Sequence, residues 1–258
     1  MERRDIMGLK SLFAATCVAT LLAACGGGSG GGGADSAPAA TAPGGIYLGY
    51  YIEDPTTNPE DPTVGAFSMN LPAGNDRFSG AMFFTYSGCQ TRNVGIVSGN
   101  KSGFEVSGRF AGTVDGTSQA GSYSGVYDQA QKRYAGVYTI DGGKQFIDRS
   151  PCVQYFIAPR GGFEMFPEGS STPASFTATV NDNTISWSGV QGAVGYLVYI
   201  YNTTPGLSDP IVWQAISTGT SQSHSQTLTG RTRHLAAVLA VNDQGQRLGF
   251  TSVSFTPR

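Results

Sequence analysis

The chain has 258 residues, of which only 13% are charged, and its formal net charge is −2. This balance offers no basic surplus for a phosphate backbone, which argues against a nucleic-acid partner, and a hydrophobic share of 40% argues against overall disorder. The 37 Gly, 14 Phe and 12 Tyr favour short strands and turns, so we predict an all-β protein.

Residues 1–24 have the pattern of an export leader. Basic residues, among them Arg3 and Lys10, precede an apolar run over 11–24. The run is too short to span a bilayer, and its length is typical of the apolar part of a signal peptide. We therefore predict that residues 1–24 are a signal peptide.

The apolar run ends in the tetrapeptide Leu22-Ala23-Ala24-Cys25. This tetrapeptide resembles the lipobox of bacterial lipoproteins. The resemblance implies cleavage before Cys25, diacylglycerol on its thiol and acylation of the new amine, which together would anchor the chain firmly in a membrane. Gly26 stands where the enterobacterial sorting pattern has an inner-membrane Asp, so the resemblance implies the outer membrane. An ordinary signal peptide with a chance Cys is the alternative.

The segment that follows is of low complexity. Residues 26–43 contain no apolar side chain larger than Ala or Pro, so they bury too little surface to become ordered. A flexible coil of this length spans roughly 25 Å on average. We predict that residues 25–43 are the lipidated Cys and a flexible linker.

Two cysteines remain once Cys17 leaves with the leader and Cys25 carries lipid. Cys89 and Cys152 lie in an exported chain, which favours a disulfide between them. Such a bond would stabilise the fold by about 4 kcal/mol in the chain-entropy model. A metal or catalytic thiol is the alternative, but no His lies between residues 44 and 168. We therefore expect a disulfide and no cofactor.

Residues 44–168 predict an antiparallel meander. Val106 and Phe110 share one parity and Ser107 and Arg109 the other, the pattern of a half-buried strand. Turn signals such as Gly99-Asn100 separate further runs. These runs lie at 46–52, 64–71, 78–86, 93–98, 119–127, 134–140, 152–157 and 162–166. Closure into a small up-and-down barrel would remove the sheet edges, and a two-sheet sandwich is the alternative.

A motif within this segment repeats. Tyr123-Ser-Gly-Val-Tyr127 recurs as Tyr134-Ala-Gly-Val-Tyr138. A glycine between two aromatics on one face leaves room for a neighbouring ring or a sheet bend. The Gly and aromatic strands behind a lipidated Cys resemble the β-barrel domains of surface lipoproteins such as the transferrin-binding and factor H-binding families. We expect most of these tyrosines in the core, and any on the outer face would form a protein- or glycan-binding patch.

Residues 171–258 resemble a fibronectin type III domain. The resemblance rests on Ile185-Ser-Trp187, on Gly195-Tyr196 and on Ala240-Val-Asn242 followed by Gly245. It implies a sandwich of seven strands in two sheets. His234 stands where the family has a tyrosine that bonds back to the chain, and an imidazole could make a similar bond.

Residues with catalytic chemistry are few. His224 and His234 are the only histidines, and their separation is not a metal-ligand spacing. Ser98 and Lys101 match Ser-x-x-Lys, but they lie at a strand end and not on the helix which that motif needs. Scattered carboxylates, which would be needed for a hydrolase, are Glu105, Asp115 and Glu164.

One acidic loop could bind a cation. The carboxylates of this loop are of the kind that Ca²⁺ prefers as ligands, and they are Glu53, Asp54, Glu60 and Asp61. A solvated loop stiffened by prolines is the alternative.

Taken together, the features of the sequence predict a lipid-anchored outer-membrane binding or adhesion protein, not an enzyme, with a protein or glycan ligand. The alternatives are an envelope structural lipoprotein and a carboxylate-dependent glycan hydrolase.

Overall fold

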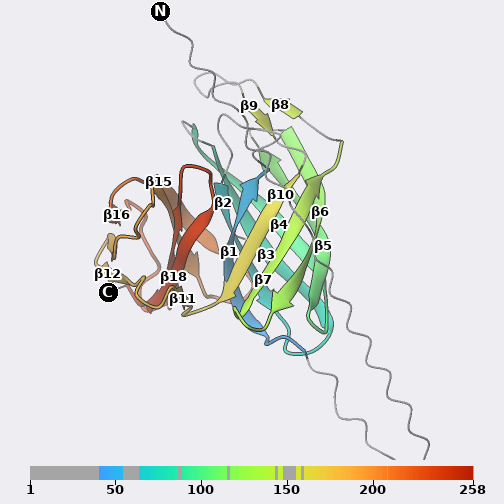
Figure 1. Cartoon of the computed structure of the whole chain (residues 1–258), viewed down its shortest axis with the longest axis horizontal. Helices are drawn as coiled ribbons and strands as arrows, with labels where there is room; N and C mark the ends of the chain where they lie inside the picture. The colour runs from blue at the N-terminus through green and yellow to red at the C-terminus, as the bar shows by residue number, and fades with distance from the viewer. Residues whose placement is uncertain are drawn as a thin grey trace, which may run out of the picture. The chain divides into compact units, whose positions relative to one another are not determined.

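The computed structural model describes the chain from Thr41 onward and is all-β (Figure 1). The described ranges are 41–54, 64–86, 89–114, 117–142, 145–147, 155–157, 160–207 and 209–257. Residues Ala39–Arg258 form one compact unit. None of the described residues belongs to a helix that is long and apolar enough to cross a membrane. The leader, Cys25 and residues 26–40 of the linker lie outside the described ranges and stay predictions.

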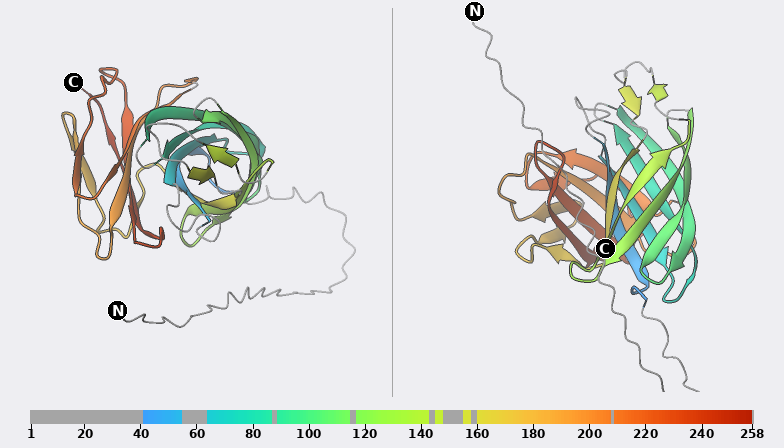
Figure 2. Two further views of the ribbon diagram at one scale, coloured as in Figure 1. Left: turned by 90° about the horizontal axis from the view of Figure 1, so that it is seen from above. Right: turned by 45° about the vertical axis from the view of Figure 1, so that its right-hand side comes forward.

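Eight antiparallel strands close into a barrel in the order β1-β10-β7-β6-β5-β4-β3-β2. The strands are β1 (Gly45–Glu53), β2 (Val64–Leu71), β3 (Asp76–Tyr86), β4 (Cys89–Ser102), β5 (Glu105–Val114), β6 (Thr117–Asp128), β7 (Arg133–Ile140) and β10 (Arg160–Pro167). The view from above shows the closed ring (Figure 2, left). The predicted barrel is therefore confirmed for this part of the chain.

The period-two pattern of the sequence separates the inner and outer faces of the barrel wall. In β5, Val106 and Phe110 are buried in the interior, whereas Ser107 and Arg109 are exposed. Alternate side chains of a strand point to opposite faces, so one hydrophobic parity is enough to fix the register of each strand.

Two local predictions are wrong. Gly99-Asn100 is not a turn, because β4 continues through it to Ser102 and the chain turns at Gly103, where φ is 60°. Of the run predicted at 152–157, the described residues Tyr155–Ile157 do not form a barrel strand. Instead β9 (Tyr155–Ile157) pairs with β8 (Gln145–Ile147) in a separate two-stranded sheet, which lies over one end of the barrel in Figure 2. Eight strands already close the barrel, so this hairpin remains in the connection between β7 and β10.

The two ends of the barrel differ in their connections. At one end the strands are joined by short turns at residues 72–75, 103–104 and 129–132. The two longest connections, between β1 and β2 and between β7 and β10, start and finish at the opposite end, where β1 ends and β10 begins.

The N-terminal segment closes the end with the short turns. The backbone N–H of Ala42 donates to the Gly103 carbonyl at 3.0 Å, and the Tyr47 hydroxyl donates to the Pro43 carbonyl at 2.9 Å. Ala42 is fully buried and packs with the residues of the barrel interior. The chain therefore enters the folded unit at the end opposite the long connections.

The remaining strands form a sandwich beside the barrel. They are β11 (Ser171–Thr172), β12 (Ala178–Asn181), β13 (Thr184–Trp187), β14 (Gly195–Asn202), β15 (Ile211–Ser217), β16 (Ser221–Ser223), β17 (His234–Val241) and β18 (Arg247–Phe255). One sheet has the order β11-β18-β17-β14-β15 and the other β12-β13-β16. Trp187 of β13 packs on Tyr196 of β14 between the sheets, with ring centroids 5.3 Å apart. Strand β15 was not predicted from the sequence.

Strand β14 is buried on both of its faces. One set of alternate side chains, which includes Tyr196 and Val198, packs inside the sandwich. The other set, which includes Leu197 and Tyr199, packs against the outside of the barrel, and the Tyr199 hydroxyl donates to the Gly49 carbonyl of β1 at 3.0 Å. The barrel and the sandwich therefore share a hydrophobic core, which explains the continuous apolar run of β14.

Candidate functional site

The four tyrosines of the repeated motif lie inside the barrel. Tyr123, Tyr127, Tyr134 and Tyr138 are each at most 9% exposed and belong to the interior cluster. The candidate outer-face patch made of these residues is therefore corrected to an interior lining. The physical reason is parity, because the outward positions between them carry Ser124, Val137 and other residues of the opposite face.

Facing glycines provide space for one interior ring. Gly125 of β6 lies directly opposite Gly136 of β7. A Cβ atom on Gly125 would lie 2.7 Å from Cζ of Phe163, and one on Gly136 would lie 2.6 Å from Cε1 of the same ring. The repeated glycine of the motif therefore leaves room for Phe163 to lie against the barrel wall.

A second pair of facing glycines accommodates a tyrosine. Gly99 of β4 lies opposite Gly108 of β5. A Cβ atom on Gly108 would lie 2.7 Å from the Tyr123 hydroxyl oxygen, which donates to the Ser98 carbonyl at 3.1 Å. Gly99 therefore serves packing within a strand, which is why its turn signal was misleading.

We expect Gly125→Ala to lower the free energy of unfolding by about 1–3 kcal/mol, because the added methyl group overpacks the Phe163 ring. Gly162→Ala is the matched control, since Gly162 is exposed and a Cβ atom there would be 3.8 Å from the nearest atom, the Gly136 carbonyl oxygen. Urea unfolding of both variants checks the difference. In a Phe163→Leu background Gly125→Ala should be less harmful, and an unchanged penalty would contradict the assigned contact.

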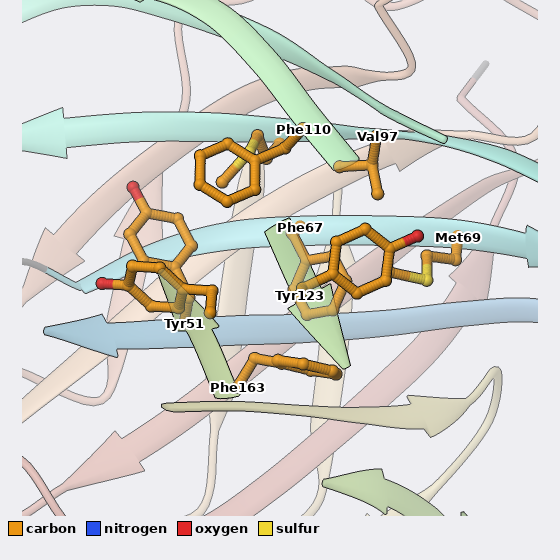
Figure 3. A pocket seen from close by; sticks show the side chains of 9 residues that line it. Tyr51, Phe67, Met69, Val97, Phe110, Tyr123 and Phe163 are labelled. Carbon is orange, nitrogen blue, oxygen red and sulfur yellow. The ribbon is translucent and has the colours of Figure 1, made fainter. Parts of the chain in front are cut away.

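The space left between the rings is small. The interior cavity has a volume of about 30 Å³, well below the range of about 300–1,000 Å³ that is typical of small-ligand sites. The Phe163 ring meets Phe67 and Tyr123 edge to face, with centroids 5.4 and 6.0 Å away. Figure 3 shows these rings around the cavity, whose lining is Tyr51, Phe67, Met69, Met82, Val97, Phe110, Tyr123, Tyr138 and Phe163. The aromatic rings thus pack this described part of the interior, and the cavity between them is too small for a small-molecule ligand.

We expect the protein to unfold at alkaline pH, when the tyrosines of the barrel interior ionise. Burial raises the pKa of Tyr123, Tyr134 and Tyr138 above the ordinary value of 10. The unfolded chain therefore loses these protons first, so the stabilisation is complete below pH 10 and is lost as the pH rises toward the folded-state values. We expect tyrosinate absorbance at 295 nm to appear together with the loss of the β-type circular dichroism. Gradual ionisation near pH 10 with the fold intact would contradict this expectation.

A charge cluster lies where the barrel meets the sandwich. The Glu164 carboxylate of β10 pairs with Arg133 of β7 and with Arg247 of β18, whose Nε is 2.5 Å from Oε2. The Tyr50 hydroxyl donates to the same carboxylate. The three charged side chains are only 14–20% exposed, and the Arg247 guanidinium also lies 5.3 Å from the centre of the Phe166 ring. Burial raises the pKa of Tyr50 to about 12, against the opposing effect of Arg247.

This cluster assigns Glu164 a structural role. Two guanidinium groups and a hydroxyl contact this one carboxylate, so Glu164 joins β1, β7 and β18 to its own strand. Of the other two scattered carboxylates, Glu105 lies at the short-turn end of the barrel and is exposed, and Asp115 is outside the described residues. Among the described residues the structure thus does not bring these carboxylates together. Sequence spacing gave no signal for the Glu164 cluster, because its members come from four strands.

Both histidines bond to their own chain. The Nδ1 of His234 is 2.8 Å from the Thr232 carbonyl, so of the two alternatives, a bond back to the chain or a weaker corner, the imidazole makes the bond. The Nδ1 of His224 is 3.2 Å from the Gln226 carbonyl, its ring lies 5.8 Å from that of Trp213, and burial lowers its pKa. Each ring nitrogen near a carbonyl must carry the proton and donate it.

Ser98 and Lys101 lie on opposite faces of β4. Ser98 is exposed, whereas Lys101 is 2% exposed and its ammonium group donates to the carbonyls of Pro72, Ala73 and Gly74 at 3.0, 3.3 and 3.4 Å. Burial lowers the pKa of Lys101. Side chains three residues apart in a strand point to opposite faces, so Ser98 and Lys101 cannot form a serine–lysine pair. Lys101 instead stabilises the turn between β2 and β3.

The acidic loop is described only in part. Asp54 Oδ2 is 2.8 Å from Nε of Arg160, so this carboxylate already has a cationic partner. Glu53 is 3% exposed, and Glu60 and Asp61 are outside the described residues. In the described part of the chain no three His, Cys, Asp or Glu side chains are placed to hold a metal ion.

The lipidation site and the disulfide stay predictions. Cys25 and Cys152 lie outside the described residues, as does the side chain of Cys89. Comparison of the chain with protein-family models, with curated proteins and with solved structures finds no match.

Proposed function

We propose that this chain is a lipid-anchored binding protein of the bacterial outer membrane, without catalytic activity. The observation that carries the proposal is the shared core of the barrel and the sandwich, whose interface contains Leu48, Tyr50 and Phe166 of the barrel and Leu197 and Phe250 of the sandwich. A shared core of this kind holds two surfaces in a fixed relation beyond the predicted linker, which suits presentation to a partner.

The geometry of the sandwich supports its relation to fibronectin type III domains, which often mediate binding. Its strand order places β12, β13 and β16 in one sheet and β14, β15, β17 and β18 in the other. Trp187 is 6% exposed between them, and His234 makes the back-bond to Thr232. The packed barrel interior directs the search for a ligand to the outer surfaces.

The anchor is tested by intact-mass measurement of protein purified from bacterial membranes. We expect the chain to begin at Cys25 with added acyl mass, and the Cys25→Ser variant to be unacylated and released from the membrane fraction. Membrane retention of an unacylated chain would refute the anchor.

Binding is tested with the unanchored Cys25→Ser protein, which keeps every described residue. We expect labelled protein to bind saturably to intact cells or matrix-coated surfaces, and excess unlabelled protein to displace it. A deletion strain with a leaky envelope, together with no saturable binding, would instead support a structural envelope role.

A further inference from the structure

We propose that the sandwich carries a site for a neutral oligosaccharide. A groove of about 600 Å³ opens between the turn joining β12 to β13, the loop at residues 225–228 and the end of the chain at residues 255–257. This volume is within the range of about 300–1,000 Å³ that is typical of small-ligand sites. Figure 1 places β12, β16 and the C-terminus together, and this sheet is not the one that packs on the barrel.

The polar side chains of the groove are free to bind a ligand. Asn181, Asp182, Asn183 and Gln226 are exposed, and their side chains make no hydrogen bond to any described residue. Elsewhere in this chain such side chains stabilise turns. Asp128, Asn202 and Asn242 accept hydrogen bonds within their own turns, and Asn75 accepts one from the Gly103 N–H in a neighbouring turn. The turn between β12 and β13 differs from these in directing its amide and carboxylate groups outward.

The backbone around the groove is nevertheless fixed. The N–H of His224 donates to the Asn183 carbonyl at 2.9 Å, which joins the two loops on either side. The hydroxyls of Thr184 and Ser223 are 3.0 Å apart and connect the same segments. Backbone bonds of this kind hold the free side chains in a defined arrangement, which reduces the entropy lost on binding.

One aromatic ring completes the lining. Phe255 is partly exposed, and its ring centroid lies 5.6 Å from that of the buried His234 ring, its cross-strand neighbour on β17. A ring held by such a neighbour offers an apolar surface to the C–H face of a sugar, while amide groups offer both donors and acceptors to its hydroxyls.

The charge of the groove favours a neutral ligand. Its described lining contains no Lys or Arg, and Asp182 is its single charged group. Among the lining residues that the structure describes, phosphates and acidic sugars would therefore meet a carboxylate and no cation. Of the described lining residues only Val180 and Asn181 of the edge strand β12 and Phe255 of β18 belong to strands, so a peptide would find too few edge residues to pair with along its length. The proposal stands on the groove alone and does not depend on the lipid anchor.

The test is titration of the Cys25→Ser protein, followed by NMR or calorimetry, with maltotriose, cellotriose and triacetylchitotriose. We expect at least one to bind with a millimolar or lower dissociation constant, and trigalacturonate to bind more weakly. Asn183→Ala and Gln226→Ala should each weaken binding about three- to tenfold, the effect of one hydrogen bond. Asn100→Ala, an exposed amide on the barrel, is the matched control and should leave binding unchanged.

Three results would overturn the proposal. They are no saturable binding of any of the three neutral sugars, preferential binding of trigalacturonate, and binding that survives the combined Asn183→Ala and Gln226→Ala change. All altered residues are exposed, so the variants are expected to fold. A melting temperature of each variant equal to that of the wild-type protein would show that it does.

Discussion

Glu164→Ala is expected to lower the free energy of unfolding by about 3–5 kcal/mol, because it leaves Arg133 and Arg247 largely buried without their shared counter-ion. The loss should exceed that of most surface substitutions, since three partners meet on this one carboxylate. Urea unfolding at neutral pH measures it. Because Arg247 belongs to the sandwich and Glu164 to the barrel, we also expect the two parts to unfold less cooperatively in the variant.

Two comparisons make this prediction specific. Asp141→Ala breaks an exposed ion pair with Arg109, whose side chains are 51% and 60% exposed, and should change stability by less than about 1 kcal/mol. Replacing Glu164, Arg133 and Arg247 together by Leu or Met should recover most of the loss, since no unpaired charge is then buried. Equal effects of Glu164→Ala and Asp141→Ala would show that the interface cluster is not important for stability.

Phe163→Ala is expected to lower the free energy of unfolding by about 3–5 kcal/mol, because it removes the ring that lies over Gly125 and Gly136. Phe163 is 5% exposed and meets Phe67 and Tyr123 edge to face. The cavity of about 30 Å³ would grow by the volume of the lost ring, and an apolar cavity of that kind can take up benzene. Benzene should therefore raise the melting temperature of the variant and not that of the wild type.

The control for this prediction lies on the outside of the same wall. Val137 of β7 is 61% exposed, and Val137→Ala should change stability by no more than about 0.5 kcal/mol. A Phe163→Ala protein of nearly wild-type stability would mean that the glycine and aromatic pattern is not a packing device.

The strands of the barrel were predictable where one parity is apolar. The sequence placed β2 (Val64–Leu71) correctly to the residue, and it anticipated that the glycines of the repeated motif make room for rings. It failed at Gly99, because a glycine needed for packing against Tyr123 looks the same in sequence as one needed for a turn. It also failed for β15, whose half-buried residues alternate weakly along the edge of a sheet.

The candidate sites were less predictable than the fold. The tyrosines were identified as the aromatic excess, but their position inside the barrel follows from which parity faces the closed interior. The Glu164 cluster joins β1, β7, β10 and β18, and the sandwich groove joins residues near 182, 226 and 256. The spacing of residues in the sequence does not predict contacts between side chains so far apart in the chain.

By itself, the sequence determined the all-β class, the alternation that builds each strand, and the division into a Gly- and aromatic-rich segment and a more ordinary one. These features depend on neighbouring residues and on the two-residue period of a strand. Only the tertiary structure decided that the barrel closes around a packed interior and that its outer face is buried against β14. The physical reason is that burial depends on the surface that meets each face, and a strand apolar on both faces does not reveal what will cover the second one.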